Sequence, residues 1–183
     1  MLTLHKHLDK DIKIILNGLT VVIDTRENEV NHITEYYDNK NIPYVFKKLD
    51  VGDYSCKLPA HGSLFNMPEP IDFCQKITIE RKNGLEELSG CIAQSRDRFE
   101  REFERGIISG TKMILMIEDG SYLKILQHNY RTNLNEKSFI ATLFSFQARY
   151  NLEVQFIPYK MSGWFIYNTL KYYAREFLKQ EAG

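Results

Sequence analysis

Cysteine is scarce in this chain, and long hydrophobic runs are absent. The three cysteines, Cys56, Cys74 and Cys91, are odd in number and show no Cys-x-x-Cys spacing, so we expect no disulfide framework. No apolar run approaches the length of a membrane span, and the first residues lack a secretory pattern. These absences favour a reduced, cytoplasmic protein without membrane contact.

A surplus of either charge is also absent. The chain has 24 basic and 24 acidic side chains and a formal net charge of zero. This balance disfavours a nonspecific polycationic coat for DNA, although clustered arginines can still bind phosphate locally. The five histidines show no ligand spacing, so we assign no zinc site.

The remaining composition is that of an ordinary globular protein. The chain has 183 residues, of which 43% are hydrophobic and 13% are aromatic. This length fits one domain with a sizeable core. We find neither an internal repeat nor a low-complexity tract.

Hydrophobic periodicity predicts helices that alternate with strands. Helical spacing is found in residues 3–16, 30–39, 85–105, 122–127, 133–150 and 162–177. Short apolar runs typical of strands are found in residues 19–24, 44–49, 53–58, 73–81, 113–117 and 154–157. Helices that alternate with strands imply an α/β sheet covered on both faces.

Several boundaries of these segments carry signals of their own. Asn133 with Glu136 resembles a capping box, and Ser162 is a candidate cap for the last helix. Residues 106–110 contain two glycines and are expected to end the helix before them. Residues 59–70 contain three prolines and are expected to form a long exposed hairpin loop.

Acidic and basic residues lie at the ends of several predicted strands. These residues are Asp24 in Val-Ile-Asp, Asp53 in Val-Gly-Asp-Tyr, and Glu80, Arg81 and Lys82 at the end of Ile-Thr-Ile-Glu-Arg-Lys. Two carboxylates can bind a hard cation such as Mg²⁺. Lys82 shares a strand face with Glu80 because side chains alternate. Two acids and a lysine around one cation are the groups needed to hydrolyse a phosphodiester.

Each fragment alone has a simpler explanation. Gly-Asp occurs in ordinary turns, and Glu-Arg-Lys occurs at exposed strand ends. Asp53 and Glu80 are 27 residues apart, yet a hairpin between their strands would bring them close. Because the fragments occur in order, each at the end of an apolar strand, they favour one shared site.

In this order, the fragments resemble the signature of the XPF-type structure-specific DNA endonucleases. That family's core motif runs Gly-Asp, a variable gap, Glu-Arg-Lys, three residues and Asp. The similarity continues through Arg98-Phe99, the strand at 113–118 and Gln-Ala-Arg-Tyr at 147–150, and covers about residues 19–175. The fold that the resemblance implies is the restriction-endonuclease-like core, with a central mixed β-sheet flanked by helices on both faces.

The resemblance also implies a role for each matched residue and a cofactor, Mg²⁺ or Mn²⁺. Asp53, Glu80 and Asp24 would bind the metal, and Glu27 would hold a ligand water. Lys82 would position or deprotonate the attacking water. No small-molecule cofactor is implied.

Arg26, Arg81 and Arg98 are the candidate DNA contacts. Arg26 and Arg81 lie near carboxylates, so pairing with those acids is an equally good interpretation. Arg98 lies in a helix that also contains Arg101 and Arg105 on one face. Interleaved acids favour a solvated helix with i,i+4 ion pairs. We prefer Arg98 as a phosphate contact because its helix starts beside the proposed site.

Two features depart from the family pattern. Glu86 stands where the last Asp of the motif would fall, with Glu87 beside it. No tandem helix-hairpin-helix module follows, so the chain resembles short stand-alone versions from bacteria and phages, with an expected place on the nucleoid or in a phage-infected cell. We expect a lead-in helix in residues 1–18 and one nuclease domain in residues 19–183. A homodimer through the last two helices is the arrangement that the resemblance implies.

Our first interpretation is a metal-dependent endonuclease that cuts branched DNA, such as flaps, forks or junctions, in repair or recombination. One alternative is a nuclease of the same fold that acts on another nucleic acid. A second alternative is a non-catalytic DNA-binding or scaffold subunit. Inactive partners are expected to lose their acids, so the presence of Asp24, Asp53, Glu80 and Lys82 favours catalysis.

Overall fold

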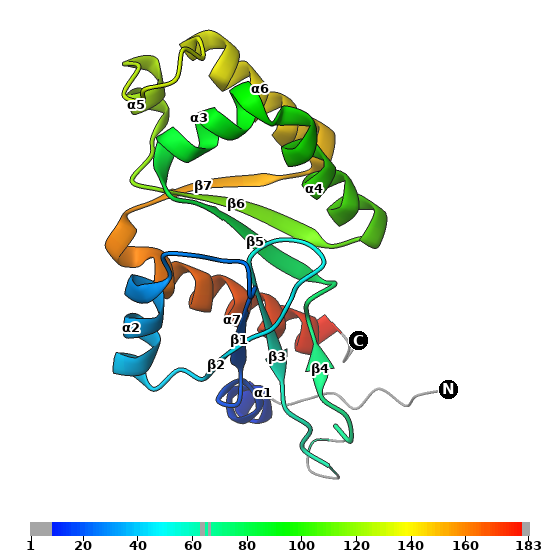
Figure 1. Ribbon diagram of the computed structural model, residues 1–183. Coiled ribbons are helices and arrows are strands. Elements are labelled where there is room, and N and C mark those ends of the chain that lie inside the picture. The colour runs from blue at the N-terminus through cyan, green and yellow to red at the C-terminus, as the bar shows by residue number, and fades with distance from the viewer. Residues whose placement is uncertain (1–8, 63–64, 66, 181–183) are drawn as a thin grey trace.

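A mixed β-sheet forms the centre of the molecule (Figure 1). The computed structural model describes residues 9–62, 65 and 67–180. Within these residues, the sheet has the strand order β2-β1-β3-β5-β6-β7, and β4 pairs with β3. The strands are β1 (Thr20–Ile23), β2 (Tyr44–Phe46), β3 (Tyr54–Leu58), β4 (Ile71–Asp72), β5 (Ile77–Lys82), β6 (Lys112–Glu118) and β7 (Glu153–Ile157).

Strand β3 joins two parallel parts of the sheet. Strands β1 and β2 are parallel, and so are β5, β6 and β7. Strand β3 runs antiparallel to both β1 and β5, with Tyr54 opposite Ile23 on one side and Ile79 on the other. The carboxyl ends of β1 and β5 therefore lie at the same edge as the start of β3.

Helices cover both faces of the sheet, as the sequence predicted (Figure 1). One face carries α1, α2 and α7, and the other carries α3 to α6. The helices are α1 (Asp9–Leu16), α2 (Asn31–Lys40), α3 (Gly84–Gln94), α4 (Arg96–Ser109), α5 (Tyr122–Leu126), α6 (Glu136–Tyr150) and α7 (Ser162–Gln180), and a short 3-10 helix, η2 (Tyr159–Met161), precedes α7.

Two hydrophobic cores lie on opposite faces of the sheet. In β6, Ile114 and Met116 belong to the core with α7, whereas Met113, Leu115 and Ile117 belong to the core with α3 and α6. This division follows from the alternation of side chains along a strand. A strand buried on both faces reads as a continuous apolar run, which is why the sequence identified it.

Two strand boundaries differ from the predictions, and one predicted helix lies partly outside the described residues. The helix predicted for residues 3–16 begins at Asp9 among the described residues, and residues 1–8 lie outside them. The strand predicted for 73–81 begins only at Ile77, because residues 73–76 form a turn closed by the Lys76 amide and the Phe73 carbonyl. The strand predicted for 44–49 ends at Phe46.

The helix predicted for 85–105 is two helices. Ser95 leaves the helical conformation, with a ψ of 34°, and separates α3 from α4. Helix α4 continues through Gly106 to Ser109, and Gly110 ends it with a φ of +69°. The predicted break at 106–110 was therefore placed too early.

Two predicted caps are wrong. Helix α6 is capped by Asn135 and not by Asn133. The side chain of Asn135 accepts hydrogen bonds from the backbone amides of Lys137 and Ser138. Ser162 is the first residue of α7, and its hydroxyl donates to Glu118 instead of capping the backbone.

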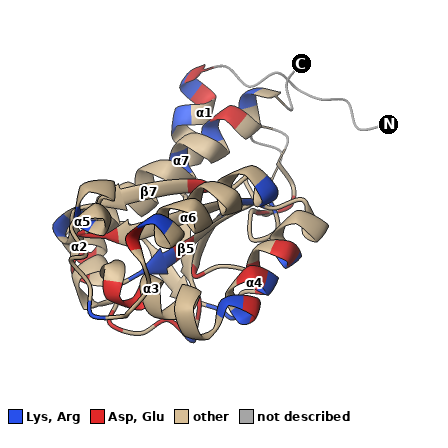
Figure 2. Cartoon of the chain, turned by 90° about the horizontal axis from the view of Figure 1, so that it is seen from above, with Lys and Arg blue, Asp and Glu red and all other residues tan. Residues whose placement is uncertain are grey.

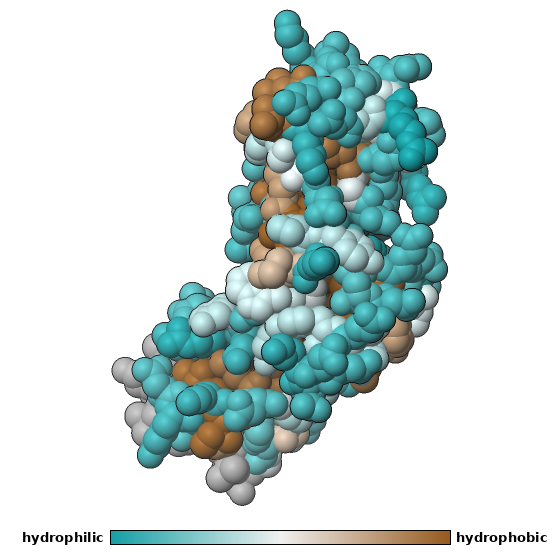
Figure 3. Space-filling model, turned by 90° about the vertical axis from the view of Figure 1, so that its left-hand side faces the viewer, coloured by the Kyte–Doolittle hydropathy of each residue, from teal (hydrophilic) through white to brown (hydrophobic). Residues whose placement is uncertain are grey.

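The face of the molecule that includes α2 and α5 is largely hydrophilic (Figure 3). On this face, hydrophobic side chains are exposed in separate patches near the top and the bottom. The exposed apolar residues of α5 are Leu123 and Leu126. None of the helices in the described part of the chain has the length and apolarity that crossing a membrane requires.

We predict that Gly52→Ala destabilises the protein by about 1–3 kcal/mol. Gly52 has a φ of +71°, and a Cβ there would lie 2.7 Å from the Cβ of Thr78. Gly90→Ala is the matched control, because a Cβ there meets no atom within 4 Å. In a helix interior, this control should stabilise by about 0.5–1 kcal/mol. Urea unfolding measures both, and equal stability of the two variants would contradict the prediction.

Candidate active site

A pocket of about 530 Å³ lies at the edge where β1 and β5 end and β3 begins. The polar residues that line it come from these strand ends, from the loop after β1, and from α3 and α4. They are Arg26, Glu27, Asn28, Glu29, Asp53, Glu80, Arg81, Lys82, Asn83, Glu87, Ser95, Arg98 and Glu102. The antiparallel position of β3 thus brings together segments that are far apart in the sequence.

Asp53, just before β3, and Glu80, on the neighbouring strand β5, both line this pocket. Burial raises the pKa of Asp53 well above its usual range, and the nearby charges of Glu80 and Glu27 raise it further. The pKa of Glu80 is also raised, because burial outweighs the attraction of Lys82. Buried carboxylates that repel one another are stabilised by a bound cation.

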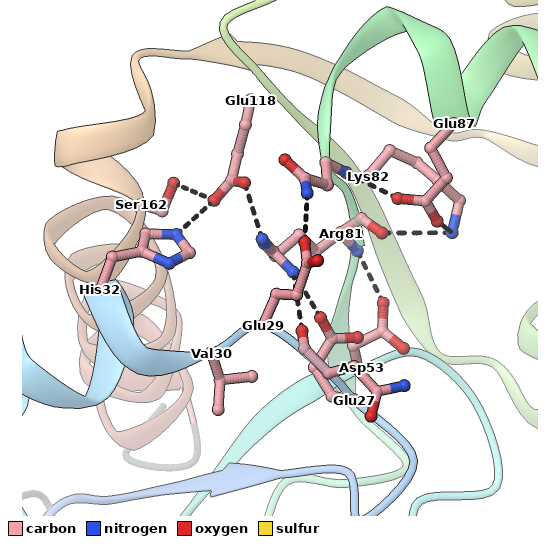
Figure 4. A network of polar contacts seen from close by, with 12 residues as sticks. Glu27, Glu29, Val30, His32, Asp53, Arg81, Lys82, Glu87, Glu118 and Ser162 are labelled. Carbon is pink, nitrogen blue, oxygen red and sulfur yellow. Dashed lines mark hydrogen bonds and ion pairs between the residues drawn. The ribbon is translucent and has the colours of Figure 1, made fainter.

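The ammonium of Lys82 supplies part of that positive charge. Its Nζ lies 2.7 Å from Oε1 of Glu80. Figure 4 shows its other two contacts, with the carbonyl oxygen of Arg81 at 3.1 Å and with Oε1 of Glu87 at 3.4 Å. Burial lowers the pKa of Lys82, but Glu80, Asp53 and Glu87 together raise it above its ordinary value. Lys82 is therefore a charged hydrogen-bond donor and not a free base.

The pocket has more acidic than basic groups. Six acidic and four basic side chains line it, a formal excess of two acidic groups. Within the described part of the chain, no three His, Cys, Asp or Glu side chains form a ready-made metal cluster. The donors that fit a hard cation are the carboxylates of Asp53 and Glu80 and the carbonyl of Arg81, which already points at the Lys82 ammonium.

The structure corrects the predicted position of Asp24. Its side chain is 1% exposed and does not line the pocket. Oδ1 accepts from the backbone amide and Nε of Arg26, at 2.7 and 2.8 Å, and Oδ2 accepts from Nη2 of Arg26 and the amide of Leu49, at 2.9 and 2.6 Å. The hydrogen bonds of Asp24 stabilise the loop after β1, and the four predicted side chains do not all meet in one pocket.

Arg26 and Arg81 both pair with carboxylates, which was the alternative to phosphate binding. Arg26 is bidentate to Asp24, yet its side chain is 58% exposed at the pocket rim. Arg81 is buried, and its Nη1 donates to Oε1 of Glu27 at 2.6 Å while Nη2 donates to Oε2 of Glu118 at 2.8 Å. Arg81 therefore cannot approach a phosphate without breaking two ion pairs.

The pocket also contains acids that the sequence did not identify. Glu87 faces it, whereas Glu86, the expected motif position, accepts a hydrogen bond from the Arg131 amide at 2.7 Å on another surface. Adjacent residues of a helix point about 100° apart, so only one of the two can face the pocket. Glu102 of α4 accepts from the amide of Gly52 at 3.0 Å.

Arg98 lies at the rim of the pocket on α4. It is exposed and has no ion-pair partner among the residues that the structure describes. Figure 2 shows both charges along this helix. The expected i,i+4 pairing is present between Arg96 and Glu100 at 2.6 Å, and Arg105 pairs with Glu102. Arg98 is left available for a partner outside the chain.

Comparison with known proteins agrees with this arrangement. Two solved structures are similar: XPF from Aeropyrum pernix (17% identity, TM-score 0.57, 84% of this chain and 61% of that chain) and XPF from Aeropyrum pernix in complex with DNA (16% identity, TM-score 0.59, 86% and 65%). In both cases, less than two thirds of the solved chain is matched. No curated protein matches.

The mixed sheet with helices on both faces is the fold of the XPF nuclease domain. The family model of the ERCC4 domain matches residues 23–168, and the chain belongs to the ERCC4 domain family. The predicted fold class and the predicted resemblance to XPF-type nucleases are thereby confirmed.

We predict that Asp24→Asn lowers the stability by about 2 kcal/mol at neutral pH. Burial raises the pKa of Asp24, but its hydrogen bonds from Arg26 and Leu49 outweigh burial and hold the pKa below 3.8. A lowered carboxylate pKa stabilises the fold above the ordinary value, and this stabilisation is lost as the pH falls through the lowered value. The difference between wild type and variant should therefore shrink below about pH 4. Chemical unfolding at several pH values measures it, and a difference independent of pH would contradict the prediction.

Proposed function

We propose that this protein is a metal-dependent endonuclease that hydrolyses phosphodiesters in branched DNA. The observation that carries the proposal is the pocket with the half-buried Asp53 and the buried Glu80 beside the charged Lys82, on the fold of the XPF nuclease domain. One of the similar structures is a complex with DNA. Membership of the ERCC4 domain family supports the same activity.

Asp53, Glu80 and the Arg81 carbonyl are the groups that would hold Mg²⁺ or Mn²⁺. When bound, such an ion would polarise the scissile phosphate and make water more acidic. The amide of Arg81 donates to Oδ2 of Asp53 at 2.8 Å and fixes the direction of that carboxylate. Glu27, held by Arg81, also lines the pocket, where its carboxylate can accept a hydrogen bond from water.

Lys82 contributes a proton donor in this proposal. Because its pKa is raised, the ammonium stays protonated at neutral pH. It can donate to a phosphate oxygen or to the attacking water, and it offsets negative charge that develops in the transition state. Of the two roles predicted for Lys82, positioning the water fits this charge state directly. Deprotonating the water would require the bound cation to lower the pKa of the ammonium.

Arg98 is the proposed first contact with the DNA backbone. Its unpaired guanidinium at the pocket rim can bind a phosphate without losing an existing partner. Arg26 is exposed at the same rim and can join it with its remaining donor atoms. Arg81 is not included, since both of its terminal nitrogens are already used.

The homodimer also remains a proposal. Helices α6 and α7 cover opposite faces of the sheet (Figure 1), so an interface that uses both must run around the β7 edge. Trp164 of α7 and Phe144 of α6 are 46% and 55% exposed and are available for such an interface. Light scattering across a concentration series would measure the oligomeric state.

A panel of substrates distinguishes this function from two others. Purified protein is incubated with labelled flap, fork, junction, duplex and single-stranded DNA and with RNA, each with Mg²⁺ or Mn²⁺. Cleavage of branched DNA supports the proposal. Cleavage of RNA alone would favour a nuclease of the same fold that acts on another nucleic acid. Binding without cleavage of any substrate would favour a scaffold subunit.

We predict that Asp53→Asn or Glu80→Gln lowers the cleavage rate roughly 100-fold or more while DNA affinity changes little. Asp53→Asn should also be at least as stable as wild type at pH 7. A raised carboxyl pKa opposes folding as the pH rises through it, and the variant removes that charge. Asp72→Asn, an exposed acid paired with Lys47, is the control and should cleave like wild type. A cleaving Asp53→Asn variant would contradict the proposal.

We predict that Lys82→Met binds Mn²⁺ roughly tenfold more tightly than wild type and cleaves DNA more slowly. The ammonium lies among the oxygens that the metal needs, so its removal would end its competition with the metal for these oxygens. Lys76→Met is the matched control, because Lys76 also lies over an aromatic ring, that of Phe177 at 4.8 Å, but outside the pocket. Titration calorimetry measures the affinity, and weaker binding by Lys82→Met would show that the lysine does not compete.

A further inference from the structure

Glu118, at the end of β6, is the centre of a buried polar network outside the pocket (Figure 4). Its side chain is 1% exposed. Oε2 accepts from Nη2 of Arg81 at 2.8 Å. Oε1 accepts from Nε2 of His32 at 2.7 Å and from the hydroxyl of Ser162 at 2.5 Å. The side chains of Arg81, His32 and Ser162 are therefore joined through one carboxylate, that of Glu118.

The partners of Glu118 come from elements that are far apart in the sequence. His32 lies in the first turn of α2, and its ring is stacked on Tyr159 of η2, with centroids 3.8 Å apart. Ser162 begins α7, so the carboxylate lies at the positive end of a 19-residue helix. Arg81 belongs to β5. Glu118 thus has a fixed position because helices from one face of the sheet and a central strand all bind it.

This fixed carboxylate determines where the Arg81 guanidinium lies. Arg81 is 4% exposed, and a buried guanidinium needs acceptors for its charge. One terminal nitrogen binds Glu118, and the other binds Glu27 at 2.6 Å and the carbonyl of Asn28 at 3.3 Å. The link from Glu118 to the pocket therefore has two steps, first to Arg81 and then to Glu27.

Among the described residues, the carboxylate of Glu27 has one hydrogen-bond partner, Arg81. Burial raises the pKa of Glu27, which shows that its carboxylate is costly to keep charged without Arg81. Beyond it, Glu29 has a φ of +55° and accepts from the side chain of Asn83 at 2.5 Å. If Arg81 lost Glu118, its guanidinium could turn away and Glu27 would lose its defined position in the pocket.

We propose that Glu118 is a positioning residue for the nuclease site, which acts through Arg81 to hold Glu27 in the orientation used with DNA. The proposal rests on the proposed endonuclease function and adds a residue from β6 to it. Glu118 does not touch the pocket. Its effect must therefore pass through Arg81, and that dependence can be measured.

The test is a double-mutant cycle of Glu118→Gln and Glu27→Gln. Each single variant should lower kcat by about 10- to 100-fold with little change in KM, because a small misplacement near the reacting groups is costly. The double variant should lose no more than the more impaired single variant, since both changes remove the same interaction. If the losses in kcat of the two single variants multiply in the double variant, Glu118 has only a general effect on the fold, and the proposal is overturned.

Hydrogen exchange gives a second readout that does not need activity. Glu118→Gln should speed exchange of the backbone amides at residues 27–30 and leave the core of β6 unchanged. Glu153→Gln is the matched control, a sheet glutamate of β7 with an exposed ion pair to Lys112 at 3.4 Å. It should change neither the kinetics nor the exchange. Unchanged exchange at residues 27–30 in Glu118→Gln would also overturn the proposal.

A third variant covers the case in which Glu118→Gln does not fold. His32→Phe keeps a ring to stack on Tyr159 and removes only the hydrogen bond to Glu118. It should lower kcat less than Glu118→Gln and be equally non-additive with Glu27→Gln; additive losses would overturn the proposal. If wild-type protein cleaves no nucleic acid, the endonuclease function fails, whereas the exchange experiment still decides the positioning role.

Discussion

The antiparallel pairing of β3 between β1 and β5 is the constraint on which the site depends. It turns the start of one strand toward the ends of two others, so that Asp53 comes beside Glu80 although the sequence separates them. A wholly parallel arrangement would place the start of a strand at the opposite edge from the ends of its neighbours. The Gly52 conformation belongs to the same constraint, because it lets the chain enter β3 against Thr78 without a side-chain clash.

Arg81 binds the neighbouring acids through two different groups, its backbone amide and its guanidinium. Its backbone amide binds Asp53, and its guanidinium joins Glu27 to Glu118. The strand residues on either side of it, Glu80 and Lys82, point into the pocket together. Alternation along one strand therefore separates the chemical groups from the buried ion pairs that support them.

Much of the fold, and part of the site, could be predicted from the sequence. Continuous apolar runs such as 113–117 identify buried strands, and the spacing of Glu80 and Lys82 places them on one face. The pairing of Asp24 with Arg26 was one of two interpretations of the sequence, but the hydrogen bond from the Leu49 amide to Asp24 was not predictable, because the two residues are 25 positions apart. The choice of Glu87 over Glu86 depends on the exact start of α3, and helix starts are what periodicity fixes least well. Glu118 was missed because a single acid at a strand end has no pattern of its own.

The placement of Lys82 among the oxygens of Glu80, Arg81 and Glu87 has a consequence for how the protein matures. A covalently tethered ammonium neutralises these oxygens at any ion concentration, so the chain need not wait for a metal before it folds. Small zinc domains behave in the opposite way and stay unfolded until loaded. Under the proposed metal dependence, a chelator would stop cleavage and leave the fold in place, and the metal could be loaded again without refolding.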